Sequence, residues 1–341
     1  MKSVKMALIG AGEIAQNFHL PIHHRLQNVE LAAICDPLRS KAQLIAEKYN
    51  IPNVYTSIDE MLTDGEFDAV DISASTDSHC EIALACIEAG KHILMEKPVA
   101  RSLEEAKKIK DAAEKSDVKV MVAMNQRFRY DAKMIKNYVS VGEVGDVFYI
   151  QAGWLQQKRG AHWKQQAARS GGGVLMDLGI SLIDSILWIY DFLPVKSVQA
   201  STFKHLHSDV EDVCISSMRF ANGSIASLEM SWSLFSSKNN FYTNVYGSKG
   251  SIKINPIELF TSGGDDKEDV YKPISAKDQM GKLTIYKKSF ESEIKHFVNA
   301  VLGFGPVIST VGEAVETMRI VKAMYLSAAE NREVMMSEIP S

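Results

Sequence analysis

A glycine-rich turn near the N-terminus has the residue types and spacing that bind a phosphate group. Gly10-Ala11-Gly12-Glu13-Ile14-Ala15 follows the apolar run 6–9 and leads into an apolar helix start. Gly10 permits a tight turn, Gly12 lets the backbone approach a pyrophosphate, and Ala15 keeps the helix close to the sheet. The N–H groups at the start of that helix then bind the anion. The alternative is a glycine turn that binds nothing.

An acidic residue completes the pattern. Asp36 stands 24 residues after Gly12, at the end of the apolar run 29–35. A carboxylate there accepts hydrogen bonds from the adenosine ribose hydroxyls and repels a 2′-phosphate, so it favours NAD over NADP. Because Arg39 and Lys41 are close in sequence and weaken that preference, NADP stays possible. The sequence therefore predicts a dinucleotide site with NAD as cofactor.

A second candidate is Lys97, in Glu96-Lys97-Pro98 directly after the apolar run 92–95. Ligands of a doubly wound sheet bind outside the carboxyl ends of its strands, so topology places Lys97 at the cofactor crevice. Pro98 restricts Lys97 to an extended backbone and admits a cis peptide bond. A lysine beside a nicotinamide can protonate a carbonyl being reduced or accept a proton from an alcohol being oxidised. The alternative is a solvated lysine at a strand end.

The elements that position these residues alternate along the N-terminal part of the chain. Short β-rich runs at 5–9, 31–35, 69–72, 92–95 and 119–123 alternate with helical patterns. Ser78 with Glu81 and Ser102 with Glu105 have the spacing of capping boxes. The pattern predicts an α/β fold whose residues 1–124 form an N-terminal Rossmann domain, a doubly wound parallel sheet.

The remaining residues, 125–341, have a different pattern. A strand at 146–152 and a helix at 170–190 precede β-rich runs with short turns, typical of an antiparallel meander. Those runs lie at 196–202, 212–220, 224–233, 241–246 and 251–254. A mobile loop is expected at 261–282, and amphipathic helices at 290–302 and 312–330. We expect a C-terminal α+β domain, built on a largely antiparallel open sheet, for substrate binding and oligomerisation.

The composition is that of a soluble globular protein. The chain has 341 residues, 46% hydrophobic and 23% charged, with a net charge of −4. That charge argues against a nucleic acid partner, and the interrupted apolar runs argue against a membrane span and a signal peptide. Four cysteines without C-x-x-C spacing predict reduced thiols and a cytoplasmic protein. No metal site is expected, because the isolated histidines, among them His19 and His23, suggest no ligand set.

These motifs resemble those of the Gfo/Idh/MocA family of nicotinamide-dependent oxidoreductases. The resemblance runs through GAGEIA (10–15), CDP (35–37), AGKHILMEKPVA (89–100), NQRF (125–128) and SGGGVLMDLGISLIDSILW (170–188). It implies a Rossmann domain and a second domain whose open sheet covers the active site and forms homo-oligomer contacts, in a dimer or tetramer. It also implies sugars, cyclitols, related polyols or their keto forms as substrates.

The resemblance assigns the catalytic lysine to Lys97 and the second-domain aspartate to Asp177, which helps to bind substrate hydroxyls and to orient the lysine. Ser181 stands where most catalytic members carry the acid/base histidine, and serine has no useful pKa near neutrality. Lys97 is expected to take the whole role if desolvation lowers its pKa. The weaker alternative is an imidazole from His162. Asp184 is expected to share the helix face of Asp177 and Ser181.

Further contacts follow from position and from the matching motifs. Asn125 and Arg127 contact cofactor or substrate, or else form a hydrogen-bonded hinge, and Trp154 offers an aromatic wall to a sugar ring. The predicted substrate contacts are Asp177, Ser181, Trp154, His162 and Arg127. The predicted cofactor contacts are Gly10, Gly12, Glu13, Ile14, Asp36, Arg39, Ser73, Ser75, Glu96, Lys97 and Asn125.

The resulting prediction is an NAD(H)-dependent oxidoreductase that transfers hydride between nicotinamide and a carbinol or carbonyl carbon of a sugar, cyclitol or related polyol. Because Ser181 replaces the usual histidine, two alternatives stay open. One is a non-catalytic regulator that binds NAD and a sugar, and the other is an NAD-retaining redox glycosidase or lyase.

Overall fold

A computed structural model of the chain describes residues 2–157, 162–206, 209–234, 239–255, 257–262, 268–271 and 281–340. The chain forms two compact units. The first contains Met1–Asn125 and Lys287–Val315, and the second contains Gln126–Tyr286 and Glu316–Ser341. The segment 287–315 therefore groups with the N-terminal residues, although it follows the second unit in sequence.

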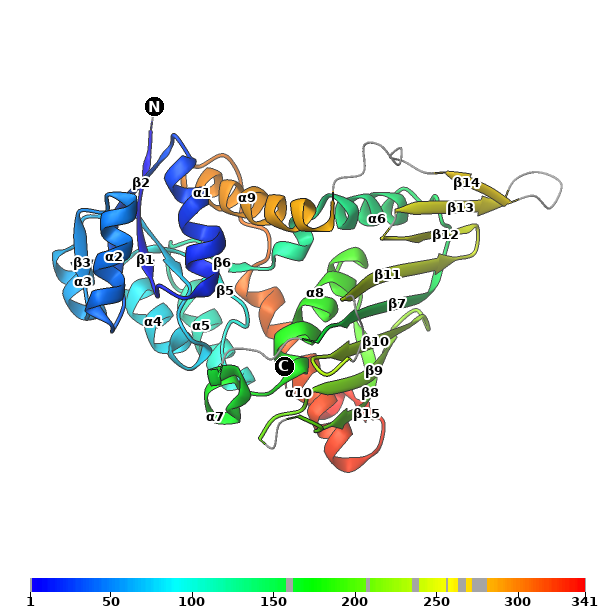
Figure 1. Ribbon diagram of the computed structural model, residues 1–341. Helices are drawn as coiled ribbons and strands as arrows, with labels where there is room; N and C mark the ends of the chain where they lie inside the picture. The colour runs from blue at the N-terminus through cyan, green and yellow to red at the C-terminus, as the bar shows by residue number, and fades with distance from the viewer. Residues whose placement is uncertain are drawn as a thin grey trace. The chain divides into compact units, whose positions relative to one another are not determined.

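The first unit is built on a six-stranded, wholly parallel sheet of order β3-β2-β1-β4-β5-β6 (Figure 1). Its strands are β1 (Val4–Ile9), β2 (Val29–Cys35), β3 (Asn53–Tyr55), β4 (Ala69–Ile72), β5 (His92–Glu96) and β6 (Val120–Ala123). Its helical segments are η1 (Ala15–His19), α1 (Leu20–Arg25), α2 (Arg39–Tyr49), α3 (Ile58–Asp64), α4 (Thr76–Glu88) and α5 (Leu103–Glu114). This order confirms the expected Rossmann sheet, whose switch point lies between β1 and β4.

Local signals explain several element ends. Gly10 has a φ of +91°, and a Cβ there would lie 2.7 Å from the backbone nitrogen of Ala74, so only glycine fits. Ser102 caps α5, because its hydroxyl accepts the Glu105 N–H at 3.2 Å. The expected capping box at Ser78 is wrong. Helix α4 starts earlier, at Thr76, because Ser75 has the extended backbone of an N-cap residue.

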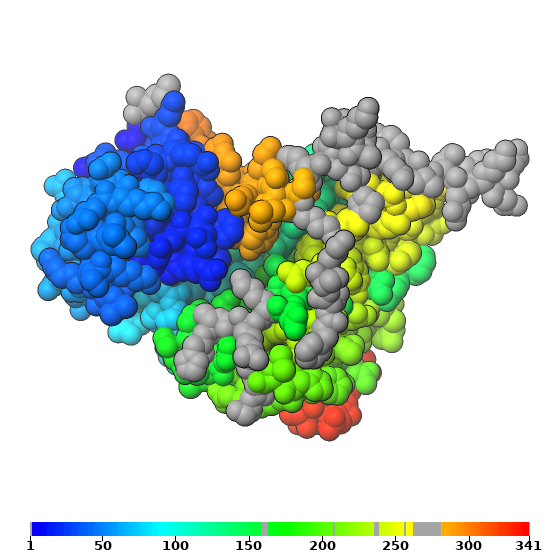
Figure 2. Space-filling view, in the orientation of Figure 1, coloured from blue at the N-terminus to red at the C-terminus, as the bar shows by residue number. Residues whose placement is uncertain are grey.

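Helix α9 (Lys282–Val301) packs on the N-terminal residues from Lys287 onward, and its orange atoms lie directly against blue ones in Figure 2. The ring of Phe290 stacks on Phe18 with centroids 4.4 Å apart. Beyond the helix, Ser309 accepts the Val122 N–H at 2.9 Å and donates its hydroxyl to the Val122 carbonyl. Residues far apart in sequence thus complete the core of this unit.

The second unit is built on a nine-stranded sheet of order β14-β13-β12-β11-β7-β10-β9-β8-β15. Its strands are β7 (Val147–Leu155), β8 (Val195–Phe203), β9 (Val213–Phe220), β10 (Ile225–Ser231), β11 (Asn240–Gly247), β12 (Gly250–Lys253), β13 (Glu258–Ser262), β14 (Glu268–Tyr271) and β15 (Val334–Met335). Only β7 and β10 pair in parallel among these described strands, so the largely antiparallel sheet is confirmed. A simple meander is wrong, since β7 lies between β10 and β11.

The helical segments that belong wholly to the second unit are α6 (Tyr130–Ser140), η3 (His162–Gln165), α7 (Ala167–Ser170), η4 (Leu175–Gly179), α8 (Ile180–Ile189) and η6 (Met336–Glu338). Segment η2 spans Asn125–Phe128, and α10 (Val311–Glu330) enters this unit at Glu316. The expected loop at 261–282 contains the end of β13 and all of β14. The rest of that range, up to residue 280, lies outside the described residues.

Two expectations from composition bear on the core. The segment Ala167–Ile189 is long and apolar enough to cross a membrane, but 83% of its most apolar window is buried, as in a core helix. All four cysteines are free and buried. Burial raises the pKa of Cys86 and of Cys214 to about 12, so both thiols stay protonated at neutral pH.

Candidate functional site

The carboxyl ends of four adjacent parallel strands gather the predicted cofactor residues on one edge of the first sheet. Gly10 follows β1, Asp36 follows β2, Ser73 follows β4, and β5 ends at Glu96, directly before Lys97. Since neighbouring strands are about 4.8 Å apart, β2 and β5 are about 14 Å apart across the sheet. This edge therefore spans the length over which an extended ligand could contact all four positions.

The turn after β1 leaves room for a ligand at Gly12. A Cβ on Gly12 would meet only the Ser73 carbonyl oxygen, at 3.5 Å, so the space beyond Gly12 is not filled by the described residues. Gln16 fixes the turn by donating its side-chain amide to the Ala11 carbonyl at 2.8 Å. Glu13 is exposed and Ile14 is half-buried at the start of the helix, where the first backbone N–H groups have no partner within a helix. The turn therefore fits a pyrophosphate.

The Asp36 carboxylate is buried and ties β2 to the glycine turn. One oxygen accepts the Ala11 N–H and the other the Leu38 N–H, each at 2.9 Å. The Lys41 ammonium lies 3.5 Å from it, while Arg39 is exposed at the start of α2. Because an ionised carboxylate has about four acceptor positions, Asp36 keeps capacity for ribose hydroxyls.

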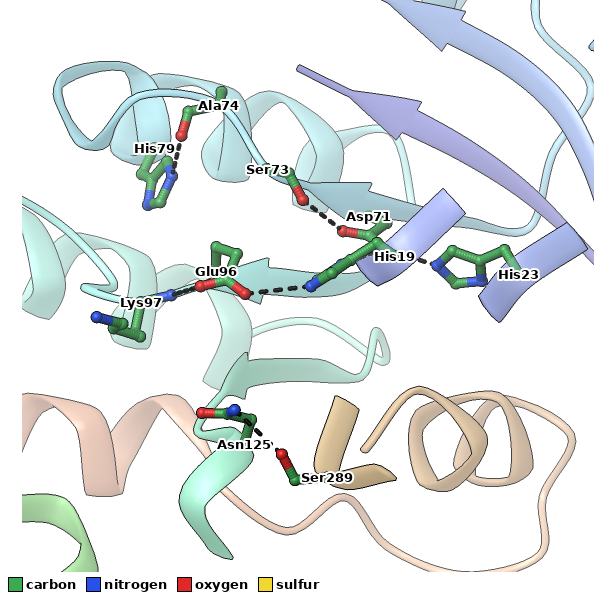
Figure 3. Close-up of polar contacts among 10 residues, drawn as sticks. All are labelled: His19, His23, Asp71, Ser73, Ala74, His79, Glu96, Lys97, Asn125 and Ser289. Atoms are coloured by element: carbon green, nitrogen blue, oxygen red, sulfur yellow. Dashed lines mark hydrogen bonds and ion pairs between the residues drawn. The ribbon is translucent and has the colours of Figure 1, made fainter. Parts of the chain in front are cut away.

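At the end of β5, the Lys97-Pro98 peptide bond is cis, which a proline at position 98 allows. Lys97 is half-buried. The Lys97 backbone N–H donates to the Glu96 carboxylate at 3.1 Å (Figure 3). The other oxygen of that carboxylate lies 3.1 Å from Nε2 of His19. Glu96 is therefore engaged on both oxygens inside the protein.

A buried cluster that the sequence did not indicate lies behind Glu96. His19 Nδ1 and His23 Nε2 each lie 2.7 Å from the same oxygen of Asp71, and Ser73 donates its hydroxyl to the other oxygen at 3.1 Å. Figure 3 shows the His19 ring between Asp71 and Glu96. The signal available was the spacing of His19 and His23, four residues apart on one helix face. Their partners lie in distant strands.

His79 joins the loops that follow β4 and β5. Its ring nitrogens lie 2.9 Å from the Pro98 carbonyl oxygen and 3.1 Å from the Ala74 carbonyl oxygen. Burial lowers the pKa of His79, although its contacts with the two carbonyl oxygens act in the opposite direction. Ser75, the residue after Ala74, is half-buried and is the N-cap of α4. His79 thus braces the Lys97-Pro98 segment.

Asn125 lies at the end of the first unit, where its side-chain amide donates to the Ser289 hydroxyl at 3.2 Å. Asn125 is buried, and its side-chain carbonyl oxygen can accept a hydrogen bond from a ligand or a structural partner. The hydrogen bond joins the loop after β6 to α9, which supports the hinge alternative for this residue.

In the second unit, Asp177 lies in the π-helical segment η4 and pairs with Lys164 at 2.6 Å. The turn before it is fixed by Glu211, whose carboxylate accepts the N–H groups of Gly173 and Leu175 at 3.0 Å and the Tyr325 hydroxyl at 2.8 Å. Burial raises the pKa of Glu211. Sequence reasoning missed Lys164, since a lysine in a loop carries no pattern that marks it as a partner of Asp177.

The other predicted substrate residues differ in their burial and in their contacts. Ser181 is buried in α8, and the side chain of His162 lies outside the described residues. Arg127 is 1% exposed and binds Asp184 through two hydrogen bonds, at 2.8 and 2.6 Å. Asp184 is therefore occupied by Arg127. Trp154 is half-buried on β7, edge-on to the ring of Phe241.

Comparison with protein families gives two matches that together cover most of the chain. Residues 4–124 match the NAD-binding Rossmann fold of an oxidoreductase family, and residues 136–336 match its C-terminal alpha/beta domain.

Individual relatives match over nearly full length. The chain is 27% identical to D-glucoside 3-dehydrogenase of Escherichia coli strain K12 over 349 residues, which cover 97% of each chain. It is 21% identical to the NADP⁺-dependent scyllo-inositol 2-dehydrogenase of Bacillus subtilis strain 168, covering 98% of this chain and 96% of the relative. Among solved structures, levoglucosan dehydrogenase in complex with NADH and levoglucosan superimposes with a TM-score of 0.89 at 24% identity, covering 100% of both chains. That likeness shows the shared fold.

Proposed function

Because this chain belongs to the Gfo/Idh/MocA family of oxidoreductases, we propose that it transfers hydride between NAD and a carbinol or carbonyl carbon of a sugar, cyclitol or related polyol. The related dehydrogenases named above act on a glucoside, an inositol and levoglucosan, which supports this class of substrate.

One observation carries the proposal. The open space at Gly12, the Asp36 carboxylate and Lys97 lie at the carboxyl ends of strands in a single parallel sheet. In that order along the sheet edge, Asp36 would hold the adenosine ribose, the turn at Gly12 the pyrophosphate, and the loops after β4 and β5 the nicotinamide half. Ser73, Ser75 and Glu96 belong to or adjoin those loops, and Asn125 follows the neighbouring strand β6.

Lys97 is the proposed acid/base. Bound NAD supplies the carbon that exchanges hydride with the substrate. During alcohol oxidation the neutral amine of Lys97 accepts the hydroxyl proton, and during carbonyl reduction its ammonium returns that proton to the oxygen. Ser181 cannot replace it as a base, because a serine hydroxyl does not ionise near neutral pH.

Asp177 is the proposed partner for substrate hydroxyls. Its carboxylate is partly exposed and paired with Lys164, so this part of the second unit presents one acceptor and one donor group to a polyol. Trp154 is proposed to contact a sugar ring. Two roles were expected for Arg127, a ligand contact or a hydrogen-bonded hinge. We assign it the hinge, because its guanidinium is buried and binds Asp184 through two hydrogen bonds.

We further propose a cytoplasmic homo-oligomer assembled through the sheet of the second unit. Phe203 on β8 and Ile215 on β9 are 45% and 53% exposed. The register pairs Phe203 with Val213 and Ser201 with Ile215, so both apolar side chains lie on one face of that sheet. These two neighbouring exposed apolar side chains are the feature that supports an interface with another chain here.

The test is an absorbance assay for NADH with purified protein, NAD or NADP, and a panel of sugars, cyclitols and sugar acids, repeated in reverse with keto compounds. We expect substrate-dependent NADH formation that Lys97→Met reduces at least a hundredfold, because general acid–base catalysis contributes about 10² to 10⁴ in rate. NAD affinity should stay within a few-fold. Lys115→Met, at an exposed site after α5, is the matched control and should retain full activity.

Each other outcome points elsewhere. Turnover of Lys97→Met like that of the wild-type protein would overturn the lysine assignment. NAD binding without turnover of any compound would indicate a non-catalytic regulator, and glycoside cleavage without net NADH would indicate a redox glycosidase or lyase.

A further inference from the structure

Three consecutive backbone N–H groups before Asp177 donate to a single residue, Glu211. Its carboxylate accepts the N–H groups of Gly173 and Leu175, and its backbone carbonyl accepts that of Val174, each at 3.0 Å. These N–H groups lie at the start of η4, where the first donors of a helix have no partner within it. Because Glu211 is 36 residues from Leu175 in sequence, a distant segment of the chain holds this end of the helix.

The surroundings of Glu211 leave the turn little freedom. Glu211 is 5% exposed, and a Cβ on Gly173 would lie 1.9 Å from its backbone carbonyl oxygen, so the close approach requires glycine. Tyr325 of α10 donates its hydroxyl to the carboxylate at 2.8 Å. Ser170 also contacts the turn, with its hydroxyl 2.7 Å from the Gly172 carbonyl oxygen, but it belongs to the same stretch of chain. Glu211 is therefore the anchor that joins the turn to the rest of the second unit.

The turn passes this constraint directly to Asp177. The Gly173 N–H donates to Glu211, and the Gly173 carbonyl oxygen accepts the Asp177 N–H at 3.0 Å. From this fixed backbone the Asp177 carboxylate reaches the Lys164 ammonium at 2.6 Å. The Asp177 side chain is 16% exposed, whereas Glu211 is buried, so a ligand can contact Asp177 and Glu211 acts through it. All of these residues belong to the second unit.

We propose that Glu211 is a positioning residue of the substrate site. Its carboxylate holds the turn at Gly173, and the turn holds the Asp177 carboxylate in the direction that binds substrate hydroxyls. The inference rests on the proposed function in assigning those hydroxyls to Asp177. Its consequence is that Glu211 contributes to the affinity for the polyol and not to the affinity for NAD.

Glu211→Ala removes the acceptor of two N–H groups and leaves the turn free to shift. A hydrogen bond from a substrate hydroxyl weakens steeply when its acceptor is misaligned. We expect KM for the polyol to rise about tenfold and kcat to stay within about threefold, because Asp177 binds the substrate in the ground state and the transition state alike. The dissociation constant of NAD should not change. Glu211→Gln keeps a side-chain oxygen that accepts N–H groups, so it should recover most of the loss.

The kinetic assay follows NADH with levoglucosan, scyllo-inositol and methyl glucoside as probes, and KM is measured for whichever the wild-type protein oxidises. Asp212→Ala is the matched control, because Asp212 is also buried but its carboxylate accepts the N–H groups of His205 and Leu206. Both alanine variants should lower the midpoint of urea unfolding, since each removes the hydrogen bonds of a buried carboxylate. Only Glu211→Ala should raise KM.

A double-variant cycle separates positioning from a general loss of stability. If Glu211 acts through Asp177, Glu211→Ala should change KM by less than about twofold in a chain that already carries Asp177→Asn. Tyr325→Phe gives the same cycle if Glu211→Ala does not fold, because it keeps the carboxylate and its N–H contacts. It should raise KM about threefold with Asp177 intact and leave KM unchanged beside Asp177→Asn.

Hydrogen–deuterium exchange observes the turn without a substrate. Peptides that cover residues 170–179 should exchange faster in Glu211→Ala than in the wild-type protein, because amides that lose their hydrogen bonds open more often. In Asp212→Ala the same peptides should exchange at the wild-type rate.

Equal effects of Glu211→Ala with and without Asp177→Asn would overturn the inference and leave Glu211 a purely structural anchor. An unchanged KM in a variant whose turn exchanges faster would overturn it as well, and so would a turn in Glu211→Ala that exchanges at the wild-type rate. Failure of the proposed function has a different signature, namely no substrate-dependent NADH from the wild-type protein, and it leaves the exchange comparison intact.

Discussion

Asp36 combines two tasks in a single side chain. Its oxygens hold the backbone N–H groups of Ala11 and Leu38, and its charge faces the place proposed for the ribose hydroxyls. Removing the charge therefore affects cofactor choice, whereas removing the whole side chain also loosens the turn after β1. The two effects separate when an isosteric variant is compared with a truncated one.

For Asp36→Asn we expect NAD to bind at least tenfold more weakly and the preference for NAD over NADP to shrink, since hydrogen bonds to a charged group contribute about 1.5 to 3 kcal/mol. Asp36→Ala should weaken both cofactors further. Fluorescence titration with NADH and NADPH measures the two affinities, and Asp59→Asn, at an exposed position in α3, is the control. Equal binding of both cofactors by the wild-type protein would refute the ribose argument.

At this scale the sequence predicts residues that are marked by local spacing and misses those defined by distant contacts. Gly12, Asp36 and Lys97 lie in short motifs next to strands, so their place follows from topology. His19 meets Asp71 and Glu96 from 52 and 77 residues away, and Lys164 in η3 meets Asp177 in η4. No local pattern records such pairs.

Among the elements, α8 is anchored by one buried ion pair. Arg127, in η2, binds Asp184 of α8 through two hydrogen bonds, and its guanidinium lies 5.1 Å from the centre of the Phe192 ring. A charge pair without access to water stabilises little when intact, but removing one partner leaves the other charge buried and uncompensated.

Arg127→Met should lower the free energy of unfolding by about 3 to 5 kcal/mol, because it leaves Asp184 buried without its partner. The double variant Arg127→Met/Asp184→Leu should recover most of that loss. Denaturant unfolding followed by circular dichroism measures both. A single variant as stable as the wild-type protein would show that the pair does not anchor α8.

Prediction of the elements from sequence succeeded where the periodicity was complete and failed where pairing is not local. The strand at 69–72 is predicted to the residue, and β1, β2, β5 and β6 to within two residues at either end. Short β3 and the position of β7 between β10 and β11 were missed, because strand order depends on contacts across the whole sheet. The π-helical η1 and η4 were also missed, since an apolar pattern does not distinguish them from α-helices.

For the whole molecule, the buried charge of His19 makes stability depend on pH. The folded-state pKa of His19 lies above its ordinary value of about 6.5, so its contribution is fully present below pH 6.5 and is lost as the pH rises through the folded value. Asp71 acts in the opposite direction, because its pKa is lowered on folding. Its contribution is present above its ordinary pKa and is lost in acid.

We therefore expect the free energy of unfolding to fall by about 1.4 kcal/mol per pH unit from His19 alone, beginning near pH 6.5. In His19→Gln this part of the slope should be absent. Urea unfolding of both proteins at half-unit steps between pH 6 and 9 makes the comparison. Parallel curves for the two proteins would show that His19 carries no extra proton in the folded state.

In the whole molecule, a segment late in the sequence returns to the first compact unit. Lys287–Val315 belongs to the first unit, where Phe290 stacks on Phe18 and Ser309 pairs with Val122. Since those contacts bury core side chains, truncating the chain after β6 would expose an apolar surface on the Rossmann sheet. The division into a Rossmann domain at 1–124 and a second domain at 125–341 stays a prediction, and the first compact unit includes this returning segment.

The two π-helical segments, η1 and η4, constrain the number of residues in their helices rather than the residue types. In η1 and η4 the hydrogen bonds run from residue i to i+5, so each segment holds one more residue than an α-helical turn would. Deleting that residue would close the wide turn to an α-helical one and change the direction of the side chains within it, while the helix beyond would keep its course. His19 and Asp177 would then leave Asp71 and Lys164. The contacts of His19 and Asp177 therefore depend on the length of these two segments.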